Sequence, residues 1–318
     1  MKPRVAVLRG GVSDEYDVSL QTGATVLESL LRRGYSTSDV LITKDGTWHI
    51  DGYPTSLEKI VRRTDVIWNA LHGAYGEDGK VQQLLETLHI PYTGSRPLAS
   101  ALCMYKDLAK DAVRKAGVRV PQGVLVRRGE HVDDVAHAIF QRMGPPYILK
   151  PRAGGSSLGL CVARTREELH AALRAVLMYA PEVIIEEYIK GRELVMGAIQ
   201  TREGATHPLW PFEVNLPQGA DVFSHEIKYA SENRYAPLES RALGEDIAHV
   251  VRKVAETLSP AHYFRVDFIL TDRGPYLLEV NTLPGLSAAS AFPKMLAQSD
   301  ISFDEFVDHV IDLALRGK

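Results

Sequence analysis

Two segments near the C-terminus carry residues whose types and spacing could hold a divalent cation. Each alternates polar with apolar residues at a period of two, which predicts two half-buried strands joined by a tight turn. The predicted strands are Arg265–Leu270 and Tyr276–Asn281, and the predicted turn is Thr271–Pro275. The polar residues of both strands should then share one face of a small sheet.

Pairing the two strands symmetrically about Arg273 sets Asp267 opposite Glu279. The same pairing sets Arg265 opposite Asn281. Like charges that face each other destabilise a ladder, so two facing carboxylates beside an amide oxygen favour a bound hard cation. Such oxygens suit Mg²⁺, which combines few protein ligands with phosphate oxygens. The alternative is a solvated sheet face whose charges have no function.

A glycine-rich stretch at residues 147–160 follows the pattern strand, loop, strand. Its glycine and serine N–H groups could surround an anion, and Lys150 at the end of the first strand adds a positive charge. The stretch lacks the Gly-Lys-Ser/Thr and the following helix of a P-loop. It is therefore either a phosphate-binding loop or a flexible surface turn.

Other polar positions stand near the ends of predicted strands. The segment Glu182–Ile189 could offer backbone groups to a purine edge and Glu193 to a ribose hydroxyl, or could be a solvent-facing strand end. His72 and Glu15 lie in loops beyond strands, where α/β sheets bind ligands. Either could instead be structural, His72 as a loop residue and Glu15 as a favourable charge at a helix N-terminus.

The elements that must position these residues indicate an α/β protein. Residues 4–33 read as strand, glycine turn and helix, and they lack the glycine fingerprint of dinucleotide binding, so NAD is not expected. Residues 97–120 are predicted to be largely helical, and residues 212–237 to form a long loop that serves as a lid. The predicted units are an N-terminal substrate-binding domain (1–95), a central domain (96–186) and a C-terminal domain with the lid and the metal site (187–318). Other predicted strands are 65–68, 90–92, 122–126, 147–150, 158–163, 182–186 and 193–200, and other predicted helices are 80–88, 132–143, 166–178 and 303–315.

Bulk composition excludes several classes of function. The 318 residues are 45% hydrophobic and 24% charged, with a net charge of −3. This charge gives no basis for binding nucleic acid or an anionic membrane. Cys103 and Cys161 are isolated and fit a reducing compartment. No signal peptide or membrane span is predicted, so we expect a cytoplasmic protein.

Taken in chain order, these motifs resemble the ATP-grasp superfamily, and more specifically the D-alanine–D-alanine ligases. The resemblance runs nearly end to end and rests on several independent motifs in the same order. The motifs are Gly10–Glu15, Val18–Leu20, Leu71–Gly73, Gly76–Gly79, Pro91–Ser95, Lys150–Pro151, Gly155–Gly159, Glu226–Tyr229, Arg265–Asp267, Glu279–Gly285 and Ser290–Pro293.

The resemblance implies an α/β fold with three domains: a parallel N-terminal α/β domain and two α+β domains that clasp ATP. It implies ATP-dependent ligation of two D-alanines through a D-alanyl phosphate, for peptidoglycan precursor synthesis and hence cell-wall biogenesis and cell shape. It also implies a homodimer, and two Mg²⁺ ions, for which Mn²⁺ could substitute. The implied metal ligands are Asp267, Glu279 and Asn281, with Glu279 shared between the ions.

The resemblance also assigns residues to the substrates. Glu15, helped by His72, would take the ammonium of the first D-alanine, and Ser290 the carboxylate of the second. Arg265 and the Gly285 N–H would stabilise the tetrahedral oxyanion. Tyr229 would close a hydrogen-bonded group with Glu15 and Ser156. The implied nucleotide-binding residues are Lys106, Lys150, Ser157, Glu186, Glu187, Ile189, Glu193, Lys228, Phe268 and Glu279, of which Glu186 and Ile189 would meet adenine, Glu193 the ribose, and Lys106, Lys150 and Lys228 the phosphates.

Some positions depart from the family pattern, and two other functions stay open. Phe223 and His225 replace tyrosines that are frequent in the lid, and Ala153–Gly154 replaces a bulkier pair. One alternative is a related ligase with another acceptor, such as D-serine, D-lactate or another amino acid, although Tyr229 argues against D-lactate. The other is a nucleotide-binding module without catalysis, against which the presence of Arg265 argues.

Overall fold

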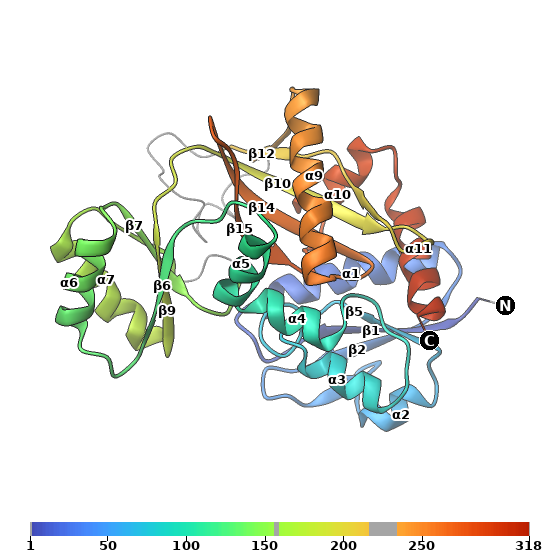
Figure 1. The fold of residues 1–318 in the computed structure, drawn as a ribbon. Helices are drawn as coiled ribbons and strands as arrows, with labels where there is room; N and C mark the ends of the chain where they lie inside the picture. The colour runs from blue at the N-terminus through green and yellow to red at the C-terminus, as the bar shows by residue number, and fades with distance from the viewer. Residues whose placement is uncertain (1, 156–158, 216–233, 318) are drawn as a thin grey trace.

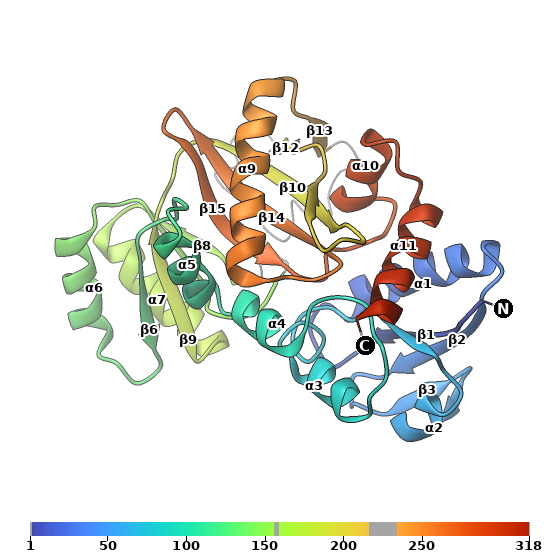
Figure 2. The ribbon, with the colours of Figure 1, turned by 45° about the vertical axis from the view of Figure 1, so that its right-hand side comes forward.

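The computed structural model describes residues 2–155, 159–215 and 234–317, which form three sheets with helices packed around them. Figure 1 shows the sheet with α6 and α7 as a lobe at one side of the molecule, while the N-terminal and C-terminal sheets lie together on the other side. Figure 2 shows the same arrangement from a second direction. Each predicted unit contains one of these sheets.

The N-terminal sheet has the strand order β4-β3-β2-β1-β5, with β1 parallel to both β2 and β5. Its elements are β1 (Arg4–Gly10), α1 (Tyr16–Arg32), β2 (Ser36–Ile42), β3 (Trp48–Ile50), β4 (Tyr53–Pro54), α2 (Leu57–Val61), β5 (Val66–Asn69) and α3 (Lys80–Thr87). Strands β2 to β4 were not predicted from the sequence. The predicted strand at 90–92 contributes one isolated bridge, from Tyr92 to Ile67.

Strand β1 reads as a continuous apolar run because both of its faces are buried. Val5 and Val7 belong to a core shared with α1 and α11, whereas Ala6 and Leu8 belong to a second core shared with α2 and α3. Parallel strands covered by helices on both sides have this pattern. The buried part of β1 therefore offers no polar side chain, and the candidate site residues Glu15 and His72 lie in loops beyond strand ends.

The central sheet has the order β6-β9-β7-β8, and all its pairings are antiparallel. Its apolar side chains form one core with those of α6 and α7. Its elements are β6 (Gly123–Arg127), α6 (Val132–Arg142), β7 (Tyr147–Pro151), β8 (Cys161–Ala163), α7 (Arg166–Tyr179) and β9 (Glu182–Glu187). The predicted strands and helices of this region are present with shifted ends.

The C-terminal sheet has the order β13-β12-β10-β14-β15, with β11 paired to β10. Helix α9 packs on one of its faces, and α10 and α11 pack on the other. Its elements are β10 (Arg192–Gln200), β11 (Thr206–Pro208), β12 (Phe212–Val214), β13 (Tyr235–Pro237), α9 (Arg241–Leu258), β14 (Tyr263–Thr271), β15 (Gly274–Asn281), α10 (Ala291–Gln298) and α11 (Phe303–Arg316). Helices α9 and α10 and strands β11 to β13 were not predicted from the sequence.

Alternation along β14 decides which side chains reach the site. Phe264 and Val266 are buried in the core that includes α9, so the residues between them point to the opposite face. Tyr263 lies in the core on that opposite face, and Arg265 and Asp267 follow it at a period of two. The fold thus sends the polar residues of this strand away from α9.

The predicted pairing of the hairpin is confirmed at its functional end. Arg265 is paired with Asn281 and Asp267 with Glu279. The register then shifts by one residue between Asp267 and Phe268, as at a β-bulge.

This shift makes the predicted five-residue turn wrong. Beyond the shift Thr271 pairs with Gly274, so the strands continue further than expected and only Asp272 and Arg273 connect them. A symmetric fold about Arg273 nevertheless gave the correct partners near the site, because the bulge adds the residue that the shorter turn removes.

The single helical region predicted for 97–120 is two helices, α4 (Pro97–Met104) and α5 (Lys106–Lys115). The break is at Tyr105, whose φ of −87° and ψ of 97° are extended. The backbone N–H of Lys106 donates to Arg152 O at 3.3 Å, so the helix start faces the glycine-rich loop. Both helices pack against β15, and the limits of the three domains therefore stay a prediction.

The loop predicted for 212–237 begins and ends in strands. Strands β12 and β13 pair with each other through Val214 and Tyr235. These strands hold the two ends of the segment together at the edge of the C-terminal sheet. The predicted lid residues between them, Phe223 and His225 included, lie outside the described residues.

A shared aromatic core joins the N-terminal sheet to the C-terminal unit. The rings of Trp68 and Tyr263 lie 6.2 Å apart, and the ring of Phe306 packs edge-on against both. All three side chains are almost fully buried. Such contacts fix the position of the N-terminal loops relative to β14 and β15.

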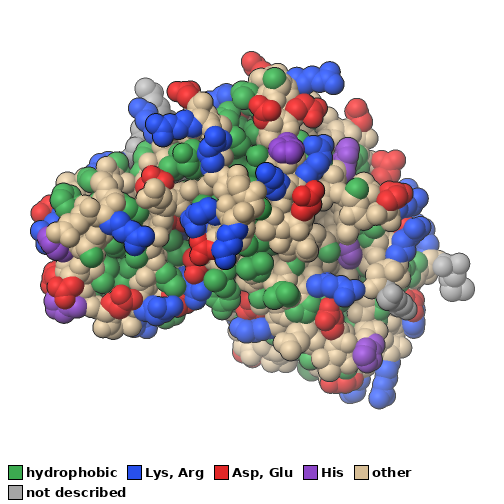
Figure 3. All heavy atoms as spheres, viewed as in Figure 1, with side chains coloured by type: hydrophobic (Ala, Val, Ile, Leu, Met, Phe, Trp, Pro, Cys, Tyr) green, Lys and Arg blue, Asp and Glu red, His purple; other side chains and the backbone are tan. Residues whose placement is uncertain are grey.

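The surface view in Figure 3 shows positive and negative side chains interspersed over this face. Within residues 2–155, 159–215 and 234–317, no helix has the length and apolar character needed to cross a bilayer.

Candidate active site

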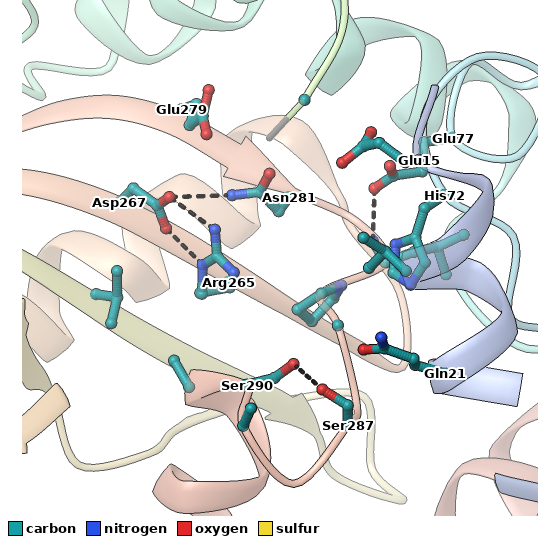
Figure 4. A pocket seen from close by; sticks show the side chains of 18 of the residues that line it. Glu15, Gln21, His72, Glu77, Arg265, Asp267, Glu279, Asn281, Ser287 and Ser290 are labelled. Atoms are coloured by element: carbon teal, nitrogen blue, oxygen red, sulfur yellow. Dashed lines mark hydrogen bonds and ion pairs between the residues drawn. The ribbon is translucent and has the colours of Figure 1, made fainter. Parts of the chain in front are cut away.

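A cavity of about 150 Å³ lies between the N-terminal loops and the C-terminal sheet. Since one water occupies roughly 30 Å³ of liquid, this space suits a molecule the size of a small amino acid. Figure 4 shows the polar side chains that face it. The predicted site residues that line it are Glu15, His72, Arg265, Asp267, Glu279, Asn281, Gly285 and Ser290.

Glu15 lies directly before helix α1, where the first turn of the chain approaches two other loops. A Cβ atom on Gly155 would come within 2.6 Å of Glu15 Oε2, and one on Gly73 within 2.8 Å. Only glycine therefore permits the glycine-rich loop and the loop after β5 to close on this carboxylate. The side chain of Glu15 makes no cap hydrogen bond to α1 and lines the cavity.

His72 is a buried residue of the cavity wall. Its Nε2 lies 2.8 Å from Thr22 Oγ1, and Thr22 Oγ1 also accepts the N–H of Leu286 at 3.3 Å. Burial, and secondarily the positive charge of Arg265, lower the pKa of His72 to about 4. His72 is therefore neutral at pH 7, and its hydrogen bond to Thr22 joins the loop after β5 to helix α1. Thr22 in turn joins α1 to the segment after β15.

We expect His72 to make stability fall in mild acid. Its pKa in the folded chain, about 4, is below the ordinary 6.5, so between these values the unfolded chain binds a proton that the folded chain does not. Stability should be complete above pH 6.5 and should fall as the pH drops towards 4. Thermal unfolding of wild type and His72→Gln should show a steeper decline for wild type over this window. The exposed His249→Gln serves as control, and parallel curves for wild type and His72→Gln would contradict the prediction.

Glu77 is a site residue to which the sequence analysis gave no role. Its carboxylate accepts the N–H of Gly73 at 2.6 Å and that of Leu283 at 3.3 Å. Burial and the nearby Glu15 raise the pKa of Glu77 to about 8. Glu77 thus ties the loop after β5 to the segment after β15. Its place in the motif Gly76–Gly79 was the signal that could have revealed it.

Arg265 and Asp267 form a two-point ion pair on the cavity face of β14. Arg265 Nε lies 2.6 Å from Asp267 Oδ1, and a terminal nitrogen lies 2.8 Å from Oδ2. Burial alone would lower the pKa of Arg265, but Asp267 outweighs it and the pKa is raised. Asn281 Nδ2 donates to Asp267 Oδ2 at a long 3.4 Å. A permanent positive charge is therefore fixed beside the cavity.

The metal prediction is not confirmed by this arrangement. Over the described ranges, no group of three or more His, Cys, Asp or Glu side chains is arranged to hold a metal ion. The facing pair Asp267 and Glu279 with the amide oxygen of Asn281 is nevertheless a donor set that suits Mg²⁺, which needs few protein ligands when phosphate oxygens supply the others. The residues present fit such an ion.

A second, smaller cavity adjoins the first and shares Glu77, Gly155, Glu279 and Asn281 with it. Lys106 lines this second cavity. Its Nζ lies 3.7 Å from Glu279 Oε2 and donates to Gly154 O at 2.5 Å. Glu279, at the functional end of the hairpin, therefore lies between the amino-acid-sized cavity and Lys106.

Lys150 and Glu186 are brought together in the central sheet. Lys150 Nζ lies 2.8 Å from Glu186 Oε2, and Lys110, which the sequence analysis did not select, contacts the other oxygen. Lys110 stands four residues after Lys106, and this helical spacing was the available signal.

The other predicted nucleotide residues are more scattered. Glu187 accepts the N–H of Gln122 at 2.8 Å, and Ile189 lies half-buried in the connection to β10. Glu193 is half-buried in β10, whereas Phe268 is fully buried in the core with α9. Their contacts with a nucleotide stay predictions. Four further predicted residues lie outside the described part of the chain: Ser156, Ser157, Lys228 and Tyr229.

Two serines close the cavity at the N-terminus of α10. Ser290 Oγ lies 2.9 Å from Ser287 Oγ, and a Cβ on Gly285 would come within 2.9 Å of Ser290 Oγ. Ser287 and Gln21 also line the cavity but were missed. Gln21 lies one helical turn after Val18, another lining residue, so the helical period was the signal for it.

These features define a class of protein. The N-terminal sheet pairs β2, β1 and β5 in parallel and adds β3 and β4 antiparallel. This sheet, a small antiparallel sheet with a glycine-rich loop, and a larger sheet that carries paired carboxylates make up the ATP-grasp fold. In this chain a cavity lined by Glu15 and Arg265 adjoins the space lined by Lys106.

Comparison with known proteins narrows this class. The description "D-ala D-ala ligase C-terminus" matches residues 112–312, and "D-ala D-ala ligase N-terminus" matches residues 52–95. A D-alanine–D-alanine ligase of Geobacter sulfurreducens is 37% identical, over 99% of this chain and 96% of the relative. The chain belongs to the D-alanine–D-alanine ligase family.

Solved structures agree with this placement. The D-alanine–D-alanine ligase of Bacillus anthracis complexed with ATP is 30% identical, with a TM-score of 0.80 over 99% of this chain and 98% of that chain. The VanG D-Ala:D-Ser ligase of Enterococcus faecalis is 27% identical, with a TM-score of 0.85 over 99% of this chain and 100% of that chain.

Proposed function

We propose that this chain joins two D-alanine molecules into D-alanyl-D-alanine, with conversion of ATP to ADP and phosphate. One observation carries the proposal: a cavity of amino-acid size touches both Glu15 and Arg265 and adjoins the space lined by Lys106. A zwitterion in this cavity can place its ammonium at Glu15 and its carboxylate at Arg265. The carboxylate would then face the lysine side, where phosphate is expected.

The chemistry follows from the weakness of a carboxylate as an acyl donor. In the proposed reaction an oxygen of the first D-alanine attacks the γ-phosphorus of ATP and forms an acyl phosphate, with ADP as leaving group. The free amine of the second D-alanine then attacks the acyl carbon, and phosphate leaves with the pair of electrons from the C–O bond. The nitrogen loses one proton in this step, to the departing phosphate or to solvent. Water must be excluded between the two steps, because it would hydrolyse the acyl phosphate.

Each step of the proposed reaction has a role for residues that line the two cavities or lie near them. Arg265, held in one orientation by Asp267, would stabilise the negative oxygen that develops on the acyl carbon. The Gly285 N–H would share this role, and Ser290 would hold the carboxylate of the second D-alanine. Lys106 and Lys150 would carry phosphate contacts, as would Lys228, and Tyr229 with Ser156 would complete the closed site.

The metal is a separate part of the proposal. Asp267, Glu279 and Asn281 would hold Mg²⁺, or Mn²⁺ in its place. The ion would offset the negative charge that accumulates on the phosphate oxygens. That the enzyme acts as a cytoplasmic homodimer in peptidoglycan precursor synthesis stays a prediction from the family resemblance.

The first test is phosphate release from Mg·ATP with D-alanine, L-alanine or no amino acid, with product masses measured in the same samples. We expect release only with D-alanine, together with the dipeptide mass. D-serine and D-lactate should be offered in competition, since a mixed product would identify another acceptor. ATP binding without release under any condition would instead support the binding module.

A further inference from the structure

A buried lysine outside the predicted site holds one of its residues. Lys110 lies in α5, its side chain is 3% exposed, and its Nζ contacts Glu186 Oε1. The side chain of Glu186 is also 3% exposed, and its other oxygen lies 2.8 Å from Lys150 Nζ. Charged side chains are almost never buried to this extent unless they are paired.

The three side chains come from different layers of the molecule. Lys150 and Glu186 stand on the neighbouring strands β7 and β9, where Glu186 is opposite Ile148, so they are diagonal neighbours on one face. Lys110 comes from α5, a helix that packs against β15 of the C-terminal sheet. The side chain of Lys110 therefore extends from a helix packed on the C-terminal sheet and contacts a carboxylate of the central sheet.

The charges of this cluster do not balance. Two lysines share one carboxylate, so the cluster carries a net positive charge whenever both lysines are protonated. Burial lowers the pKa of Lys110 despite Glu186, whereas Glu186 and Glu279 raise the pKa of Lys150 against burial. The pKa of Glu186 is lowered by the two lysines, although burial opposes this.

Removal of Lys110 would weaken the attraction of Lys150 for an anion. Glu186 and Lys150 would become a neutral one-to-one pair in a poorly hydrated site, where opposite charges attract strongly. An anion would have to compete with Glu186 for Lys150. With Lys110 present, part of the negative charge of Glu186 is already neutralised. Glu186 then holds Lys150 less strongly, and Lys150 can still attract an anion.

We propose that Lys110 is a positioning residue of the nucleotide site: it holds Glu186 so that Lys150 keeps a positive charge available for nucleotide phosphates. This inference rests on the proposed function, because it takes Lys150 as a phosphate contact. Lys110 itself need not touch the nucleotide. Its effect should therefore appear in phosphate binding rather than in binding of the nucleoside.

The test measures equilibrium binding of ADP and of adenosine to Lys110→Met, without amino-acid substrate. Affinity for ADP should fall about tenfold or more, as expected when a short-range charge interaction is lost. Affinity for adenosine should stay within about threefold, because adenosine has no phosphate for Lys150. Lys115→Met is the matched control, since Lys115 is an exposed residue of the same helix.

A double variant separates this role from a purely structural one. In Lys110→Met/Glu186→Gln the carboxylate that would capture Lys150 is neutral, so the ratio of ADP affinity to adenosine affinity should return to near the wild-type ratio. The ratio is the readout because a lost contact between Glu186 and adenine would weaken both ligands alike. A structural role predicts that ADP and adenosine affinities fall together with the midpoint of thermal unfolding, without recovery in the double variant. That outcome would overturn the inference.

The failure of this inference is distinguishable from that of the proposed function. Wild-type protein that binds no ADP would remove the proposed function and the inference with it. Wild-type protein that binds ADP, with unchanged ADP affinity in Lys110→Met, would overturn only the role of Lys110.

Discussion

Replacement of Arg265 by alanine is expected to lower the turnover of dipeptide formation by about 10²- to 10³-fold, the usual loss when one well-placed oxyanion donor is removed. Arg265 is fixed by two contacts to Asp267 and points into the cavity, so its charge is already oriented before substrate arrives. ADP affinity should change little, because the nucleotide phosphates are assigned to lysines. Turnover and ADP binding are measured on the same preparations.

The control for this variant lies on the same hairpin. Arg273 is exposed in the turn, far along β14 from the cavity, and Arg273→Ala should keep wild-type turnover. Near-normal ligation by Arg265→Ala would remove the arginine from the mechanism. Parallel loss of ADP binding would instead point to a general disturbance of the hairpin, which thermal unfolding would reveal.

Replacement of Glu279 by glutamine is expected to lower turnover at least about 10²-fold and to raise the Mg²⁺ concentration needed for half-maximal rate. Glutamine keeps the shape of the side chain but removes the charge that faces Asp267 and lies near Lys106. A site that loses one of two carboxylates attracts a divalent cation less strongly.

Metal binding gives a readout that does not depend on turnover. Mn²⁺ bound in the presence of a non-hydrolysable ATP analogue, followed by its paramagnetic spectrum, should decrease in Glu279→Gln. Asp272→Asn, an exposed change in the turn of the same hairpin, should bind Mn²⁺ as wild type does. Equal Mn²⁺ binding by Glu279→Gln and wild type would exclude Glu279 as a metal ligand.

Both expectations depend on a face of a hairpin that the sequence predicted correctly. Alternation of period two assigns Arg265 and Asp267 to one side of β14, and close antiparallel pairing sets their partners. These are short-range relations, so they hold whatever the rest of the chain does. The exact turn was wrong, because a bulge is not visible in the alternation pattern alone.

The glycine-rich loop shows where sequence and tertiary structure share the information. Its glycine content allows the backbone to approach another group closely. The sequence of the loop does not determine which group that is. Gly155 comes against Glu15 from the other end of the chain, and a side chain at this position would collide with the carboxylate. The choice of partner depends on how the central unit is placed against the N-terminal loops.

The sequence by itself determined the α/β class, the hairpin face, the candidate phosphate loop and, through its motifs, the family. Only the tertiary structure decided that Glu77 binds the N–H of Leu283, 206 residues away, and that Lys110 reaches Glu186 across 76 residues. Local periodicity reports which side of an element is buried. It carries no information on which distant element covers that side, because this depends on the packing of all three sheets together.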